Sequence, residues 1–359
     1  MSASTETKSN TIYTGWESPS NIALIKYWGK YGNQLPRNPS VSFTLTSAAT
    51  RTFVKWTKDE NTATNNKVKV SLVFDGKTNT QFLPRIEKFL EKMSDTHLPF
   101  LKNSQIEIET SNSFPHSSGI ASSASAMSAL ALSLCDIENT LEGKQGFSEM
   151  FYRKASYVAR LGSGSACRSI YPNMAVWGTQ PSLQDSSEEW AVGISEDVHP
   201  IFKDFHDDIL IISPKEKSVS SSAGHQLMEN NPYASARYLQ AKNNLTDILV
   251  ALKDGDLDTF GKITEAEALT LHALMMCSDP AYILMEEGSL SVIKKIQQFR
   301  IENNIPVWFT LDAGPNVHVL YPSTVEQQVN HFIIHELKPF CHEGRIIRDK
   351  VGLGPKKIS

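Results

Sequence analysis

The sequence predicts an α+β protein built from two domains. Segments with strand-like alternation and segments with helical spacing follow one another in both halves of the chain, without a repeated Rossmann unit. A chain of 359 residues suits one large domain or two medium ones. The polar segment 180–189 shifts the composition and is typical of a surface loop near a domain boundary. We therefore expect a disordered tail over 1–10, an N-terminal domain over 11–190 and a C-terminal domain over 191–359.

In the first half, alternation of apolar and polar residues predicts strands over 52–56, 68–74 and 105–109. The polar segment 57–67 between the first two strands is interpreted as a hairpin loop. Helical spacing, or a long run of small apolar residues, predicts three helices: over 84–93, in a stretch up to Leu134, and over 151–160 before Gly162.

In the second half, an apolar run predicts a buried strand over 208–213. Helical spacing predicts three helices, over 238–252, 257–276 and 289–303. Two further strands, over 307–311 and 317–321, are expected on either side of a turn.

The composition excludes several classes of protein. The chain is 40% hydrophobic and 21% charged, with a net charge of −4 and no basic stripe, so no nucleic-acid partner is expected. The N-terminus lacks the apolar core of a signal peptide, and no apolar run is long enough to span a membrane. We expect a soluble, cytoplasmic protein without a membrane partner. The four widely separated cysteines are expected to be buried free thiols: Cys135, Cys167, Cys277 and Cys341.

The loop from Asn112 to Ser125 is the most informative segment. It contains Pro115 and Gly119 and leads directly into the expected helix of small residues. A helix start offers unpaired N–H groups and a positive dipole end to an anion. Four hydroxyls can bind phosphate oxygens or magnesium: Ser117, Ser118, Ser122 and Ser123. No Gly-Lys-Ser/Thr follows, which disfavours a Walker-type nucleotide hydrolase. Close packing of a small-residue helix is the alternative interpretation.

Two further segments carry anion-binding side chains. Lys26, Tyr27 and Lys30 follow an apolar strand, where their charges and phenol can hold a polyanionic group. Solvated lysines at a strand end are the alternative. The segment 160–169 alternates Gly and Ser before Arg168, a pattern that indicates a phosphate-binding turn followed by an arginine clamp.

Three segments in the second half add candidates. The segment 217–225 offers further hydroxyls and, taken alone, is predicted to be a loop. Asp312 ends an apolar strand before a Gly-Pro turn, as catalytic bases often do, although such an Asp also opens turns through its own side chain. His272 lies on an apolar helix, and we interpret it as a hydrogen-bonded structural histidine.

In this order the segments resemble the mevalonate diphosphate decarboxylases, a branch of the GHMP kinase superfamily. The resemblance runs from about Ser18 to the C-terminal tail and rests on six motifs, at residues 21–30, 36–45, 114–124, 162–169, 219–221 and 309–316. It implies a two-domain GHMP kinase fold, with an N-terminal domain like domain 2 of ribosomal protein S5 and a ferredoxin-like C-terminal domain. It also implies a homodimer.

The resemblance implies ATP-dependent decarboxylation of mevalonate 5-diphosphate to isopentenyl diphosphate, with ATP and Mg²⁺ as cofactors. The implied catalytic residues are Asp312, Lys26 and Arg168, of which Arg168 also holds the substrate carboxylate. The implied ligands of the phosphorylated substrate are Tyr27, Lys30, Ser163, Ser165 and Ser220. The implied ligands of ATP are Pro115, Ser117, Ser118, Gly119, Ser122 and Ser123, with Ser122 also a metal ligand.

The chain departs from the family pattern at His116, at Pro172-Asn173 and at His225. These departures leave open a substrate with one phosphate, mevalonate 5-phosphate, which would give isopentenyl phosphate. A kinase that stops after 3-phosphorylation and a non-catalytic protein that binds metabolites are further alternatives. Both are disfavoured by the presence of Asp312 together with Arg168.

Overall fold

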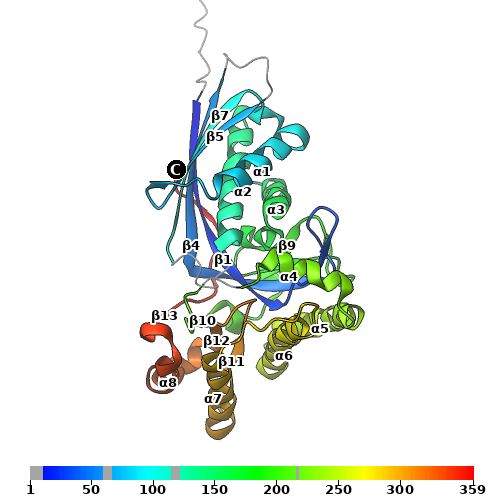
Figure 1. The fold of residues 1–359 in the computed structure, drawn as a ribbon, viewed down its shortest axis with the longest axis vertical. Coiled ribbons are helices and arrows are strands. Elements are labelled where there is room, and N and C mark those ends of the chain that lie inside the picture. Colours follow the sequence, from blue (N-terminus) through cyan, green and yellow to red (C-terminus); the bar gives the residue numbers. More distant parts are fainter. Residues whose placement is uncertain (1–10, 60–66, 115–121, 216–217) are drawn as a thin grey trace, which may run out of the picture.

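The computed structural model describes residues 11–59, 67–114, 122–215 and 218–359. Figure 1 shows two layered units along the long axis of the molecule, each with a sheet and helices packed on it. An α+β protein of two domains, as the sequence predicts, is confirmed.

Two long antiparallel strands form the centre of the larger sheet. The main strand order is β14-β1-β4-β7-β5-β6, and β8 and β9 extend the sheet beside one end of β4. The strands of this sheet are β1 (Thr11–Ile25), β4 (Ser40–Lys58), β5 (Val68–Phe74), β6 (Lys77–Thr78), β7 (Ser104–Asn112), β8 (Met174–Trp177), β9 (Ala191–Gly193) and β14 (Lys356–Lys357). A separate pair, β2 (Lys30–Tyr31) and β3 (Leu35–Pro36), follows β1.

The predicted hairpin over 57–67 is wrong. β4 and β5 do not pair with each other, because β7 lies between them, antiparallel to β4 and parallel to β5. The chain reaches β7 from β5 through the helix α1 (Leu83–Thr96), as a parallel pair requires. Alternation of apolar residues predicts a half-buried strand but does not identify its neighbour.

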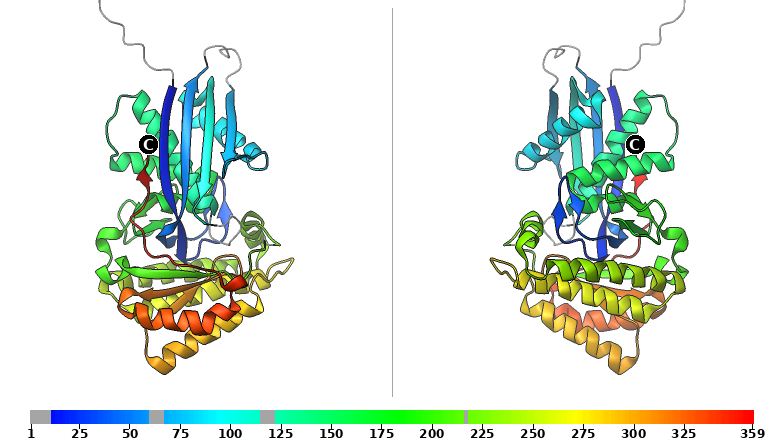
Figure 2. Two further views of the ribbon diagram at one scale, coloured as in Figure 1. Left: turned by 90° about the vertical axis from the view of Figure 1, so that its left-hand side faces the viewer. Right: turned by 90° about the vertical axis from the view of Figure 1, so that its right-hand side faces the viewer.

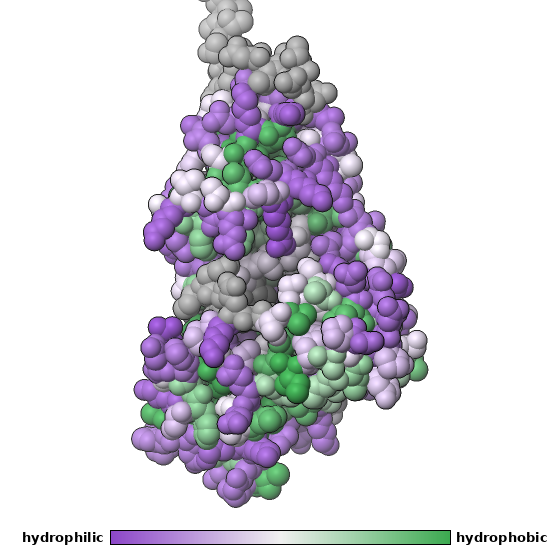
Figure 3. Space-filling view, viewed as in Figure 1, coloured by the Kyte–Doolittle hydropathy of each residue, from purple (hydrophilic) through white to green (hydrophobic). Residues whose placement is uncertain are grey.

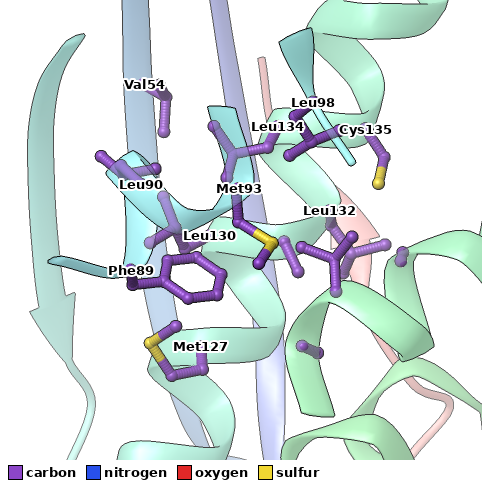
Figure 4. Packing of buried hydrophobic residues seen from close by; sticks show 14 of the residues in the cluster. Val54, Phe89, Leu90, Met93, Leu98, Met127, Leu130, Leu132, Leu134 and Cys135 are labelled. Atoms are coloured by element: carbon purple, nitrogen blue, oxygen red, sulfur yellow. The ribbon is translucent and has the colours of Figure 1, made fainter. Parts of the chain in front are cut away.

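Three helices cover one face of this sheet, and all three predictions of helix are confirmed. They are α1, α2 (Ser122–Leu141) and α3 (Glu149–Gly162). Nearly every residue of α2 from Ala124 to Ile137 is buried, because the helix packs against both the sheet and α3. Figure 4 shows Phe89 and Met93 of α1 facing Met127 and Leu130 of α2 in the resulting core.

The second unit contains a four-stranded sheet in the order β11-β12-β10-β13. Its strands are β10 (Phe205–Leu210), β11 (Trp308–Thr310), β12 (Val317–Pro322) and β13 (Ile346–Ile347). The predicted strand over 208–213 therefore lies three residues too late, because Asp207 and Asp208, although charged, are buried within the strand. The pair of strands around a turn near residue 312 is confirmed.

The predicted helices of the second half are confirmed. The helices of this unit are α4 (Ser221–Leu227), α5 (Ala234–Asp254), α6 (Leu257–Met276), α7 (Glu287–Asn303) and α8 (Glu326–Phe332). α5 ends at Gly255, whose φ of +79° suits glycine, and α6 begins at once with the side chain of Asp256 accepting the Thr259 N–H.

The C-terminal tail returns to the first unit. β14 pairs with β1, and Figure 2 shows the end of the chain beside that strand. The Asp349 carboxylate accepts three N–H groups of β4, from Thr46, Ser47 and Ala48, at 2.7–2.8 Å. The tail therefore joins the two units, while the division between residues 190 and 191 stays a prediction.

The structure also tests the expectations that the cysteines are buried and that no segment spans a membrane. Cys135, Cys167 and Cys341 are buried as expected, but Cys277 is exposed because it caps the end of α6, so the prediction was wrong there. Within the described ranges, none of the helices combines the length and apolar character needed to cross a bilayer.

Candidate active site

Lys26 and Asp312 meet where the two units join. Lys26 follows the end of β1, and Asp312 lies in the turn between β11 and β12. The Lys26 Nζ lies 3.0 Å from Asp312 Oδ1, with 2% of the lysine side chain and 29% of the aspartate side chain exposed. The structure thus brings two predicted catalytic residues from opposite halves of the chain into one ion pair, with the carboxylate accessible to a ligand. The face in Figure 3 is hollowed at the level where the two units meet.

The backbone of Lys26 is held by a buried network that the sequence analysis missed. Glu267 of α6 accepts the Lys26 N–H at 2.8 Å, while Arg237 of α5 donates to the Lys26 carbonyl at 3.1 Å. The same arginine forms a two-bond ion pair with Glu267, at 2.5 and 2.6 Å. Asn38 and Asn244 complete the network through the Lys26 carbonyl and the Glu267 carboxylate. Every one of these bonds fixes the position of the lysine.

The Asp312 turn is held in a similar way. His272 of α6 lies 3.1 Å from the Asp312 carbonyl, which assigns the proton to its Nε2. Burial lowers the pKa of His272 to about 4, so the ring is neutral near pH 7. The interpretation of His272 as a hydrogen-bonded histidine is confirmed. Asn316 anchors the far end of the turn by accepting the N–H groups of Ile212 and Ser213.

Negative charge surrounds the buried lysine. Burial lowers the pKa of Lys26, and the charges of Asp312, Glu267 and Asp207 oppose that shift. Asp207 is itself paired with His318 Nδ1 at 2.8 Å, inside the smaller sheet. Three carboxylates therefore favour the ammonium form of a lysine that burial alone would neutralise.

Arg168 is fully buried. The segment predicted to be a phosphate-binding turn forms the short 3₁₀ helix Gly164–Ile170, most of which is buried, and Arg168 lies within it. Its guanidinium donates to the hydroxyls of Ser42 and Ser40 and to the Asn21 carbonyl oxygen, at 3.0, 2.6 and 3.3 Å. These bonds use one N–H on each nitrogen, which leaves one on each terminal nitrogen for a ligand.

The predicted substrate-binding wall contains a buried polar atom without a protein partner among the described residues. The buried Tyr27 hydroxyl has no hydrogen-bond partner within the described ranges, and its ring packs against the rings of Trp177 and His225. Lys30 Nζ lies 3.0 Å from Gln34, and burial together with the charge of Arg85 lowers its pKa. The charges of Arg168 and Arg160 also act on Tyr27, and a buried hydroxyl without a partner near two cations indicates a site for an anionic ligand.

Two serines of this wall, Ser163 and Ser165, flank a glycine that lies against Tyr27. The Ser163 hydroxyl lies 3.4 Å from the Ser123 hydroxyl at the start of α2, and Ser165 is half-buried one turn further along. Gly164 lies between them, where a Cβ would stand 2.9 Å from the Tyr27 hydroxyl. Only glycine leaves room for the phenol at this position.

Ser220 caps a helix. The segment predicted to be a loop instead forms α4, and the Ser220 hydroxyl accepts the Ala223 N–H at 3.2 Å. The loop prediction was wrong because the hydroxyl residues act as a helix cap rather than as turn formers.

A pocket opens at the start of α2. Its wall includes Arg85, Ser122 and Ser123, together with apolar side chains of β5, β7 and α1. Its polar end, at the N-terminus of α2, suits a phosphate group of a nucleotide. Pro115, Ser117, Ser118 and Gly119, with His116, lie outside the described residues. Within the described part of the chain, no three His, Cys, Asp or Glu side chains gather as a metal site, so a Mg²⁺ ion here would depend on phosphate and hydroxyl oxygens.

Comparison with known proteins agrees with this arrangement. The family model of a diphosphomevalonate decarboxylase-like N-terminal domain matches residues 18–188, and that of a mevalonate 5-diphosphate decarboxylase C-terminal domain matches residues 208–356. The diphosphomevalonate decarboxylase of Debaryomyces hansenii is 30% identical over 336 residues, covering 89% of this chain and 82% of that protein.

Solved structures agree as well. Mevalonate diphosphate decarboxylase from Staphylococcus aureus is 28% identical, with a TM-score of 0.82 over 97% of this chain and 98% of that one. A structure of MDDEF in complex with MVAPP, AMPPCP and magnesium is 27% identical, with a TM-score of 0.81 over 97% and 99%. The two-domain GHMP kinase fold is thereby confirmed, and the chain belongs to the diphosphomevalonate decarboxylase family.

Proposed function

We propose that this chain catalyses the ATP-dependent decarboxylation of mevalonate 5-diphosphate to isopentenyl diphosphate, with release of ADP, phosphate and carbon dioxide. The observation that carries the proposal is the ion pair of buried Lys26 with accessible Asp312. Members of the family are named for the diphosphate substrate, and one solved relative holds MVAPP, an ATP analogue and magnesium.

Asp312 acts on the 3-hydroxyl of the substrate. Its carboxylate orients the hydroxyl and takes its proton as the oxygen attacks the γ-phosphoryl group of ATP. Lys26 keeps this carboxylate ionised and supports the departing phosphate from its buried position. When the phosphate leaves with the electron pair of the C3–O bond, the Asp312 charge stabilises the positive centre at C3.

Arg168 holds the carboxylate that becomes carbon dioxide. The two N–H groups that its protein partners leave unused can hold the carboxylate with parallel bonds. The electron pair of the bond between the carboxylate and C2 then forms the double bond of the product. Because the guanidinium is fixed by Ser40, Ser42 and Asn21, it orients the carboxylate without moving with it.

The phosphate groups occupy the remaining polar walls. Tyr27, Lys30, Ser163, Ser165 and Ser220 hold the substrate diphosphate, and the cavity at the start of α2 holds ATP. Ser122 lies at the polar end of that cavity and is our candidate magnesium ligand. When bound, Mg²⁺ neutralises charge on the transferring phosphoryl group.

The test compares two substrates. The enzyme, ATP and Mg²⁺ are incubated with mevalonate 5-diphosphate or with mevalonate 5-phosphate, and released carbon dioxide is measured. We expect release with the diphosphate and at least about tenfold less with the monophosphate, because Tyr27 and Lys30 lose a charged partner. A stable 3-phosphorylated product would instead indicate a kinase, and binding without any turnover would indicate a non-catalytic protein.

The oligomeric state and the cellular location belong to the same proposal. We propose a homodimer, as the resemblance to the family implies, and a cytoplasmic location, since the composition is that of an ordinary globular protein. Light scattering coupled to size-exclusion chromatography should give twice the chain mass of 39.9 kDa, and a value of one chain mass would reject the dimer.

A further inference from the structure

His225 lies against the substrate-binding wall but has no assigned role. It belongs to α4 and is 8% exposed. Its ring centroid lies 4.3 Å from that of Tyr27 and 4.6 Å from that of Trp28. Its Nδ1 accepts the Gly29 N–H at 3.0 Å. One side chain of the second unit thus contacts three consecutive residues of the first.

The hydrogen bond fixes the state of the imidazole. Because Nδ1 accepts, it carries no proton, so the proton of the neutral ring lies on Nε2. Burial, helped by the charge of Lys30, lowers the pKa of His225 to about 3. A protonated ring would present N–H to N–H at Gly29, and the contact would be lost.

Gly29 is the point at which this contact matters. Its φ of +94° is a conformation that favours glycine, and a Cβ there would stand 2.4 Å from the Tyr238 hydroxyl. The orientation of its peptide therefore sets how Tyr27 and Lys30 leave the turn on either side. Trp28 is buried in a cluster of the second unit that includes Leu271 and Ala313, the neighbour of Asp312.

We propose that His225 is a positioning residue that holds the Tyr27–Lys30 turn in the geometry that grips the substrate diphosphate. The inference rests on the proposed function. Its basis is the joint restraint of the Gly29 peptide by a hydrogen bond and of Tyr27 and Trp28 by ring packing. The restraint comes from α4, so it also fixes that helix, with Ser220 at its cap, against the diphosphate wall.

Two substitutions of His225 distinguish the effect of its hydrogen-bond acceptor from the effect of its ring. His225→Phe keeps a ring and removes the acceptor, whereas His225→Asn can place its amide oxygen near the position of Nδ1. We expect His225→Phe to raise the KM for mevalonate 5-diphosphate about tenfold, since a buried N–H is left unpaired. The kcat and the KM for ATP should change by less than about twofold, because neither Asp312 nor the nucleotide cavity is touched. The Asn variant should recover part of the loss in KM.

The control is His331→Phe on α8, where the histidine is exposed and distant in sequence from the wall. It should leave all three constants unchanged. A folded His225→Phe enzyme with wild-type KM, or with only a lower kcat, overturns the proposal. If wild-type enzyme releases no carbon dioxide, the proposed function fails, and calorimetric titration with the diphosphate then tests His225 alone by the same tenfold criterion.

A measurement on the wild-type protein tests the proposal without activity, even if a substituted variant does not fold. Nitrogen NMR of the histidines in wild-type protein should show the His225 ring protonated at Nε2, with Nδ1 as acceptor, and the signal is assigned to His225 by its absence from His225→Asn. A proton on Nδ1 of His225 would remove the bond to Gly29 and overturn the proposal.

Discussion

The two sides of the active site differ in how the protein satisfies their polar groups. Around Lys26 and Asp312, buried partners hold both backbones, and the two side chains hold each other. On the diphosphate wall, the Tyr27 hydroxyl is buried without a partner in the described part of the chain, and Lys30 sits beside the like charge of Arg85. The ion pairs of the first side are formed before any ligand arrives, although Arg237 Nε and Asn38 Oδ1 lack a partner in the described part of the chain. On the second side, the proposed ligand supplies the partner that the Tyr27 hydroxyl lacks.

The difference follows from what each side must do. Charge at C3 and on the attacking oxygen develops only during the reaction, so the groups that meet it work best when already oriented. A diphosphate arrives with its charge, and donors without partners gain more from it than donors that must first give up a bond. The comparison predicts that substitutions around Lys26 and Asp312 alter turnover and stability, whereas substitutions on the diphosphate wall alter substrate binding.

The largest effect is expected for Asp312→Asn. Turnover should fall about 10³-fold or more, because an amide neither takes the hydroxyl proton nor stabilises positive charge at C3. Binding of ATP and of mevalonate 5-diphosphate should be largely retained, as measured by calorimetry. An Asn variant that keeps a tenth of wild-type turnover would remove Asp312 from the role of base.

The next effect is expected from the network behind Lys26. Arg237→Met leaves the buried Glu267 carboxylate without its cation and should lower the free energy of unfolding by about 3 kcal/mol. Urea denaturation measures this loss. Glu336→Gln is the matched control, because its pair with Lys295 has side chains that are 51% and 36% exposed. The control should cost less than about 1 kcal/mol, and equal losses would contradict the comparison.

A smaller effect concerns pH. The unfolded chain protonates a histidine near pH 6.5, while native His272 stays neutral to about pH 4. Its contribution to stability is therefore complete above pH 6.5 and is lost as the pH falls towards 4. Between pH 7 and pH 5 this costs about 2 kcal/mol. Burial raises the pKa of Asp208 and Glu265, which act in the opposite direction, so the difference between wild type and His272→Gln isolates the histidine.

Between pH 7 and pH 5, the free energy of unfolding of His272→Gln should fall by about 2 kcal/mol less than that of the wild type. Thermal or urea unfolding at both pH values provides the measurement. Parallel losses in the two proteins would mean that native His272 accepts a proton as readily as the unfolded chain does, against the effect of its burial.

The sequence identified the catalytic pair more readily than its support. Asp312 stood out by its position at a strand end, where reactive side chains are common. The catalytic role of Lys26 was implied by the family resemblance, because a lysine at a strand end is as often simply solvated. Arg237 and Glu267 lie inside ordinary helices. A signal was present, since Arg237 precedes Ala241, Leu245 and Ile248 on one buried stripe. A charged residue on an apolar stripe indicates a buried partner, but spacing within one helix cannot say which residue on another helix provides it.

The order of the strands could not be predicted from the sequence, for a related reason. Residues 52–56 and 68–74 show the alternation of half-buried strands, yet β7, from 30 residues further along, separates them. The burial of Arg168 was also not predicted, because glycine and serine around it are as common in exposed turns as in tight internal ones. Local pattern specifies an element, and long-range packing decides its neighbours.

The smallest effect, expected for Tyr27→Phe, separates the two sides most sharply. Removal of a buried hydroxyl without a partner should leave the free energy of unfolding unchanged or raise it by up to about 1 kcal/mol, while affinity for mevalonate 5-diphosphate falls about tenfold. Tyr321→Phe is the opposite case, because its hydroxyl donates to buried Asp208 at 2.6 Å, far from the proposed wall. That variant should lose about 1–3 kcal/mol of stability with unchanged substrate binding. If Tyr27→Phe destabilised the protein as Tyr321→Phe does, its hydroxyl would already have a partner in the ligand-free enzyme, and the wall would not differ from the catalytic pair in the way described.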